Sequence, residues 1–80
     1  MSYPCPCCSN FTFDEEPSGT YEICPVCGWE DDEVQFNAPS FAGGANKPSL
    51  NEAKANYKEF GACDKELVNI VRSPLEYEIP

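Results

Sequence analysis

Two short cysteine pairs constrain this 80-residue chain more than any other feature. The first lies in Cys5-Pro6-Cys7-Cys8 and the second in Cys24-Pro25-Val26-Cys27. With Cys5, Cys8, Cys24 and Cys27 as ligands, the pattern is C-x2-C-x15-C-x2-C, a spacing typical of a four-cysteine zinc site. Four thiolates fill a tetrahedral shell and leave no position open for water or substrate. The pattern therefore predicts a structural zinc ion rather than a catalytic one.

The small size of the chain also favours a metal. A domain of 80 residues has a small core, and the free energy of metal binding adds directly to its folding. Six cysteines can also indicate a disulfide scaffold. However, residues 1–5 show neither the basic nor the apolar part of a signal peptide, and three cysteines crowd into positions 5–8. We therefore expect zinc, with iron as the alternative metal, in the reducing cytoplasm.

The charge of the chain limits its partners and its chemistry. Asp and Glu number 14 against 5 Lys and Arg, so the formal net charge is −9. The cations all lie in the second half of the chain: Lys47, Lys54, Lys58, Lys65 and Arg72. Because phosphate binding depends on Lys and Arg, we expect neither nucleic acid nor an anionic membrane as a partner. The sequence has no His, which removes Ser–His and Cys–His catalytic arrangements, so we expect no enzyme activity.

The pattern along the chain predicts one zinc-binding domain over residues 1–80, a small metal-stabilised α+β fold. Residues 3–33 are expected to form a zinc-ribbon-like β-hairpin that carries both CxxC turns, or knuckles. Apolar and polar residues alternate in Phe11–Phe13 and in Thr20–Ile23, so these two segments are predicted to pair as its strands. Trp29 is expected to pack in the core beside the metal. Residues 34–48, rich in Gly, Pro and Asn, are predicted to be an irregular connector.

Residues 49–71 form the helical part of the prediction. Ser49 and Glu52 have the spacing of a capping box at the start of a helix. Its apolar face would carry Leu50, Ala53, Tyr57 and Phe60, and Gly61 would end it. A second short helix is predicted from Asp64 to about Ile70. Residues 72–80 alternate apolar and acidic residues and are expected to be an extended tail.

Several residues near the cysteine pairs are open to a functional interpretation. Cys7 could replace Cys8 as a ligand or act as a reactive thiol, although a small packed side chain is the simplest interpretation. Cys63 is expected to be half-buried. The run Glu30–Glu33 is most simply a solvated acidic loop, and the alternatives are a patch for a basic partner or a site for a hard cation.

Taken together, several motifs resemble the cysteine-rich CPCC family of small bacterial proteins. The residues that carry the resemblance are Cys5-Pro6-Cys7-Cys8, Tyr21-Glu22-Ile23-Cys24-Pro25-Val26-Cys27, Trp29-Glu30-Asp31-Asp32, Gly43-Gly44-Ala45-Asn46, and Ser49-Leu50 through Asn56-Tyr57 to Phe60-Gly61-Ala62-Cys63-Asp64. The resemblance implies a zinc-ribbon-like or rubredoxin-like metal domain. It implies no specific activity or partner.

Three functions are compatible with these features. The leading hypothesis is a non-catalytic protein-binding module, with a structural zinc ion and an acidic face that meets the basic surface of another protein. The second is a rubredoxin-like iron protein that carries electrons. The third is a thiol redox sensor that uses Cys7. The sequence implies no particular oligomeric state.

Overall fold

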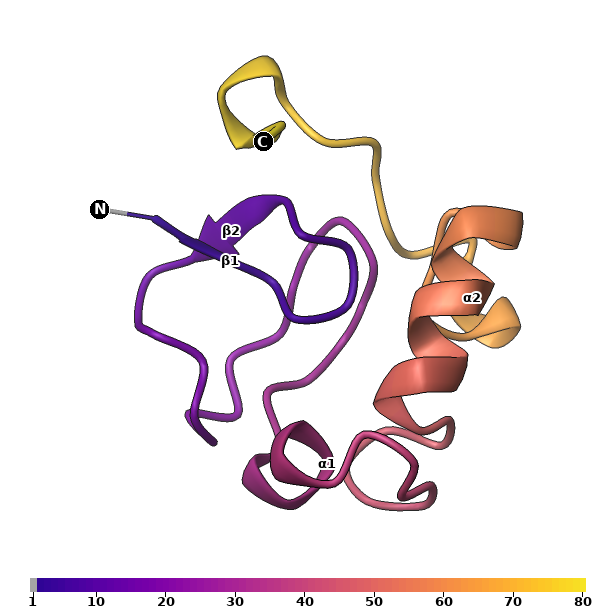
Figure 1. Ribbon diagram of the computed structural model, residues 1–80. Coiled ribbons are helices and arrows are strands. Elements are labelled where there is room, and N and C mark those ends of the chain that lie inside the picture. The colour runs from indigo at the N-terminus through magenta and orange to yellow at the C-terminus, as the bar shows by residue number, and fades with distance from the viewer. Residues whose placement is uncertain (1) are drawn as a thin grey trace.

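The computed structural model describes residues 2–80, so Met1, with which the predicted domain begins, lies outside it. The chain forms strands β1 (Tyr3–Pro4) and β2 (Phe11–Phe13) and helices α1 (Glu33–Asn37) and α2 (Leu50–Phe60). Two 3-10 turns follow, η1 (Lys65–Leu67) and η2 (Glu76–Glu78). This arrangement confirms the predicted small α+β fold (Figure 1). None of the described helices is long and apolar enough to cross a membrane.

The strand pairing differs from the prediction. Strand β2 pairs antiparallel with β1, with Tyr3 opposite Phe13, and Ile23 instead forms a single bridge with Glu30. Each knuckle therefore lies at the tip of its own short hairpin. The predicted pairing of 11–13 with 20–23 was wrong because Tyr21 has a φ of 60°, which interrupts a strand at this point.

The core contains the buried side chains of the knuckles together with Phe13 and Trp29, both fully buried. The core position predicted for Trp29 is thus confirmed. Helix α2 adds Leu50 and Ala53 to the same cluster. About one turn further along α2, Tyr57 is partly buried, and its hydroxyl accepts a hydrogen bond of 3.2 Å from Asn10 Nδ2.

The ends of α2 follow the sequence closely. The side chain of Ser49 accepts from the N–H of Glu52, and the carboxylate of Glu52 accepts from the N–H of Ser49, so the predicted capping box is present. Gly61 ends the helix with a φ of 80°. Phe60, the last member of the predicted apolar face, is 38% exposed because it lies beyond the core that covers the first turns.

The connector is more ordered than predicted, since it contains α1 and is organised by Gln35. The amide nitrogen of Gln35 donates to the carbonyl oxygens of Phe41, Asn46 and Pro48 at 3.0–3.1 Å. A Cβ at Gly44 would lie 2.7 Å from the Oδ2 atom of Asp32, so the chain can approach this network only at a glycine. The side-chain amide of Gln35 thus provides a hydrogen-bond donor for three carbonyl oxygens that would otherwise lack one.

The C-terminal part also differs from the prediction. The helix expected from Asp64 to Ile70 is reduced to η1, whose first turn is capped by the Asp64 carboxylate. The predicted extended tail contains η2, which contacts β2 (Figure 1). Its buried Glu78 receives two hydrogen bonds from the guanidinium of Arg72, at 2.8 and 2.9 Å. This ion pair closes the tail on itself, and the N–H of Arg72 attaches the start of the tail to the body by donating to the carbonyl oxygen of Pro25 at 3.2 Å.

Candidate metal centre

The two knuckles have the same backbone conformation. In the first, the N–H of Ser9 donates to the carbonyl of Cys5 at 2.9 Å, and in the second the N–H of Gly28 donates to Cys24 at 2.8 Å. Ser9 and Gly28 both adopt a positive φ, 68° and 86°. The repeated sequence Cys-Pro-x-Cys therefore folds into two matching turns, and each turn directs two sulfurs to one side.

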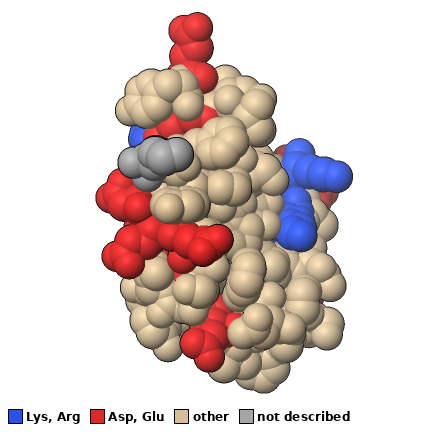
Figure 2. Space-filling model, turned by 60° about the vertical axis from the view of Figure 1, so that its left-hand side comes forward, with Lys and Arg blue, Asp and Glu red and all other residues tan. Residues whose placement is uncertain are grey.

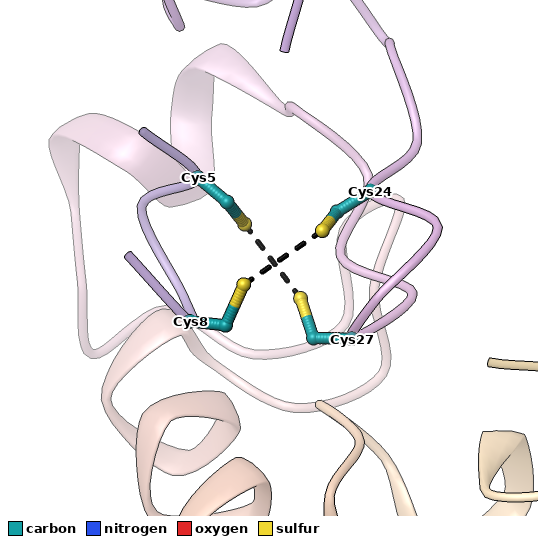
Figure 3. Close-up of side chains that lie close together, drawn as sticks. All are labelled: Cys5, Cys8, Cys24 and Cys27. Carbon is teal, nitrogen blue, oxygen red and sulfur yellow. Dashed lines mark hydrogen bonds between the residues drawn. The ribbon is translucent and has the colours of Figure 1, made fainter. Parts of the chain in front are cut away.

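The sulfur atoms of Cys5, Cys8, Cys24 and Cys27 converge on one point (Figure 3). All four lie within 4.8 Å of one another, with 3.6 Å between Cys5 and Cys27 and 3.8 Å between Cys8 and Cys24. A tetrahedron with metal–sulfur bonds of about 2.3 Å has edges of about 3.8 Å. The spacing of the sulfurs thus fits a tetrahedral metal site.

The surroundings of the sulfurs suit thiolates. Cys5, Cys24 and Cys27 are at most 1% exposed, whereas Cys8 is half-buried. The hydroxyl of Thr12 lies 3.0 Å from Cys24 Sγ, and the N–H of Trp29 donates to Cys27 Sγ at 3.5 Å. Hydrogen bonds to ligand sulfurs orient them and stabilise their negative charge.

Four thiols this close cannot all ionise by themselves. The neighbouring Cys24 sulfur is the largest cause of the raised pKa of both Cys5 and Cys27, because it stabilises the protonated form of each thiol. The same contacts, first from Cys27 and then from Cys5, lower the pKa of Cys24. A cation at the centre would relieve the repulsion and allow all four to be thiolates.

The donor set fits a soft or borderline metal. Four sulfurs in a tetrahedron suit zinc or iron, and the carboxylates that calcium or magnesium prefer do not take part. A bound ion would cross-link the two knuckles, whose paired cysteines are 16 residues apart in the sequence for Cys8 and Cys24 and 22 for Cys5 and Cys27. Because the four cysteines would fill the shell, the ion would have no position left for a substrate.

Cys7 lies where Val26 lies in the other knuckle. Both side chains are in the core cluster, with exposures of 6% and 1%. The structure does not place Cys7 among the four converging sulfurs. This position agrees with the simplest interpretation of Cys7, a small packed side chain.

Cys63 is buried rather than half-buried as predicted, with an exposure of 1%. Its N–H donates to the carbonyl oxygen of Cys27 at 2.7 Å, which fastens the segment after α2 to the second knuckle. Burial raises the pKa of the Cys63 thiol to about 12. A protonated, enclosed thiol is a poor nucleophile.

The solvated-loop prediction for Glu30–Glu33 is wrong for Asp31 and Asp32, which are buried. The Oδ2 atom of Asp31 accepts from the amides of residues 18, 19 and 20 and from the Thr20 hydroxyl, all at 2.9–3.0 Å. Burial alone would raise the pKa of Asp31, but these amides lower it below its usual value. The carboxylate thus anchors the preceding loop, with its charge satisfied by backbone dipoles.

Asp32 has a different structural role. Its Oδ1 atom caps α1 by accepting from Val34 and Gln35, and its Oδ2 atom accepts from the N–H of Ala45 at 2.9 Å. The Ala45 amide is the main cause of the lowered pKa of Asp32. Both buried aspartates therefore hold the fold together. Asp31 Oδ2 and both oxygens of Asp32 accept from backbone amides, whereas Asp31 Oδ1 is buried with no hydrogen-bond partner among the described residues. Within residues 2–80, neither aspartate belongs to a cluster of side chains that could hold a cation.

Sequence reasoning missed the polar centre formed by Gln35 and Asn46. Asn46 donates to Gln35 Oε1 at 2.9 Å and pairs with both backbone groups of Glu30, at 2.8 Å each. A signal existed, because an Asp three residues before Gln35 is a typical N-cap and predicts a helix start there. Nothing in the sequence indicated that the amide of Gln35 would be buried.

Comparison with known proteins agrees with the geometry of the centre. No curated protein matches the chain. A family model described as "Cysteine-rich CPCC" matches residues 3–78, a range that includes both knuckles, the polar centre and the C-terminal turn. The chain belongs to the cysteine-rich CPCC family.

Proposed function

We propose that the four cysteines bind one zinc ion with a structural role, and that the protein is a non-catalytic module that binds another protein through an acidic face. The observation that carries the zinc site is the tetrahedral spacing of the four sulfurs, which are 3.6 Å apart in Cys5 and Cys27 and 3.8 Å apart in Cys8 and Cys24. Three of the four ligands belong to the most buried side chains of the core. A metal at this point would stabilise the whole fold.

We define the acidic face by five acidic residues that are exposed or partly exposed: Asp14, Glu15, Glu16, Glu22 and Glu33. The buried Asp31 and Asp32 are not part of it. The five residues lie close together in the fold. The Glu22 carboxylate accepts from the N–H of Asp14 at 2.9 Å, and a Cβ at Gly19 would be 2.7 Å from Cβ of Glu33. Figure 2 shows acidic side chains gathered mainly on the left of this side of the molecule, while most of the basic surface in view lies at its right-hand edge.

No Lys or Arg neutralises the acidic face within residues 2–80. The ion pairs in that range join Lys47 to Glu66 and Arg72 to Glu78, both outside the face. Repulsion among unpaired carboxylates is relieved when a basic surface approaches, and their field speeds the encounter. This supports a partner protein with a basic surface.

Analysis of the metal in the purified protein tests the first half of the proposal. Mass spectrometry under native and denaturing conditions should show one zinc ion per chain, which is lost on denaturation, in a colourless preparation. The half-buried position of Cys8 favours the alternative of an iron electron carrier, because electron transfer needs a ligand near the surface. A coloured, redox-active preparation with one iron per chain would establish that alternative instead.

Charge reversal tests the second half. A partner isolated with the zinc-loaded protein at low salt should be lost with the double variant Asp14→Lys/Glu15→Lys. The matched control is Glu59→Lys/Glu76→Lys, which changes the net charge equally at two exposed carboxylates outside the acidic face. A partner that is lost equally with both double variants responds only to net charge, and this result would contradict a role for the acidic face.

A further inference from the structure

A hollow of about 380 Å³ lies between the first knuckle and the acidic face. Its apolar walls include the rings of Tyr3, Pro6, Pro17 and Phe36, and Glu16 is its acidic wall residue. These residues come from four separate segments: β1, the first knuckle, the loop before Gly19, and α1. The hollow is therefore a product of the tertiary structure.

The two aromatic residues of the hollow are partly exposed. Tyr3 and Phe36 are each 37% exposed, whereas Phe13 and Trp29 in the core are fully buried. Proline and aromatic rings provide apolar surface for the alkyl part of a long side chain, and an aromatic face also attracts a cation. The walls thus suit a Lys or Arg side chain better than a purely aliphatic one.

The charge around the hollow has one sign. The side chain of Glu16 is exposed and has no hydrogen-bond partner among the residues that the structure describes. Glu33 begins α1, the helix that supplies Phe36. None of the five Lys and Arg residues lines the hollow. A cation entering it would gain a carboxylate partner, while an anion would face repulsion.

We propose that this hollow receives one Lys or Arg side chain from an extended segment of the partner protein. The alkyl stem would pack against Phe36 and Pro17, and the charged end would pair with Glu16. The inference rests on the proposed function, because it places the centre of recognition at one point on the acidic face. It adds a requirement for apolar walls that a purely electrostatic surface would not have.

The test uses NMR on the full-length, zinc-loaded, 15N-labelled protein. The probe is a seven-residue Gly/Ser peptide with one central Arg, and its control is the same peptide with citrulline, which keeps the shape and removes the charge. With the Arg peptide, the amide resonances of Tyr3, Ser9 and Phe36 should move in a saturable way. With the citrulline peptide, affinity should fall at least fivefold.

Variants separate the hollow from the rest of the acidic face. Phe36→Ala and Glu16→Gln should each weaken binding of the Arg peptide at least threefold. Val34→Ala is the matched control, because Val34 is an exposed residue of the same helix that does not line the hollow, and it should leave the affinity unchanged. Retained zinc and an unchanged Trp29 indole resonance would show that each variant is folded.

The outcomes distinguish the two proposals. Resonance changes confined to residues 14, 15 and 33, with affinity unaffected by Phe36→Ala, would refute the hollow and leave the acidic face in place. Equal binding of the Arg and citrulline peptides would refute recognition of a cation in the hollow. No change of any resonance at low salt and millimolar peptide would count against both the hollow and the acidic-face function.

Discussion

Leu67 lies directly against Gly28, so that a Cβ at position 28 would be only 2.9 Å from Leu67 Cδ1. Gly28 also has a φ of 86°, a conformation that side-chain-bearing residues adopt at a cost. Leu67 is the last residue of η1, so this turn covers the end of the second knuckle. This contact explains why the segment after α2 belongs to the metal-binding body.

Alanine substitutions at Gly43 and Gly28 should separate the energetic cost of a positive φ from the cost of displacing Leu67. Gly43→Ala changes a position of similar φ, 83°, with no atom within 4 Å, and should cost about 1 kcal/mol of unfolding free energy. Gly28→Ala should cost about 1 kcal/mol more, because Leu67 must move. Urea denaturation at a fixed free-zinc concentration measures both. Equal losses for the two variants would show that Leu67 adapts without cost.

Substitutions in the first knuckle should show which cysteines bind the metal. Cys8→Ser should lose zinc and cooperative unfolding, because a fourth thiolate is missing. Cys7→Val should keep one zinc per chain, because Val26 occupies the equivalent place in the second knuckle. Metal content and thermal unfolding monitored by Trp29 fluorescence report both effects. Zinc loss in Cys7→Val with full retention in Cys8→Ser would make Cys7 the ligand.

Gln35→Leu should destabilise the fold while leaving the metal site intact. The change removes a donor shared by three carbonyl oxygens and should cost about 2–4 kcal/mol. Zinc stoichiometry should remain one per chain, since the side-chain hydrogen bonds of Gln35 in the described structure involve no cysteine. Asn37→Ala, at the exposed end of the same helix, is the control and should change stability by less than about 0.5 kcal/mol. A small effect of Gln35→Leu would mean that water replaces the lost donor.

Asp31→Asn should reveal the pH dependence of the buried aspartate. The folded pKa of Asp31 lies below its usual value of 3.8, so the ionised group stabilises the fold above that pH. We expect a difference of about 1–3 kcal/mol between wild type and Asp31→Asn at pH 7. The difference should stay constant down to about pH 5 and shrink as the pH falls below about 4.

Protonation of the thiolates releases metal in the same acidic range, so each comparison is made at one pH with the same zinc buffer. Metal release then lowers the free energy of unfolding of wild type and of Asp31→Asn alike, so the difference between the two proteins reports the contribution of Asp31. The control is Glu33→Gln, which alters an exposed carboxylate two residues away. A difference that grows on acidification would show that burial, and not the amides of residues 18–20, dominates the pKa of Asp31.

Local rules explain why parts of the structure could be predicted. The spacing of Cys5 and Cys8, and of Cys24 and Cys27, sets two sulfurs on each turn, and the turns have the same hydrogen bonds. The capping box of Ser49 and Glu52 and the glycine at position 61 fixed the limits of α2. In each case the interacting groups are only a few residues apart.

The two buried aspartates show where such rules stop. Asp31 and Asp32 belong to an acidic run that is indistinguishable in composition from the exposed Asp14–Glu16. One run is solvated, while these two carboxylates are enclosed by amides of residues 18–20 and by that of Ala45. Composition gives the charge of a run, but the position of distant amides decides whether that charge is exposed.

The sequence by itself determined the four cysteines that converge, the two matching knuckles and the helix α2, because these depend on groups close together in the chain. Only the tertiary structure decided that each knuckle closes its own hairpin, that Gln35 forms a polar centre, and that η2 in the tail contacts β2. These features depend on contacts and hydrogen-bond partners supplied by remote segments. A buried polar group must find such a partner, and its identity is fixed only when the segments pack together.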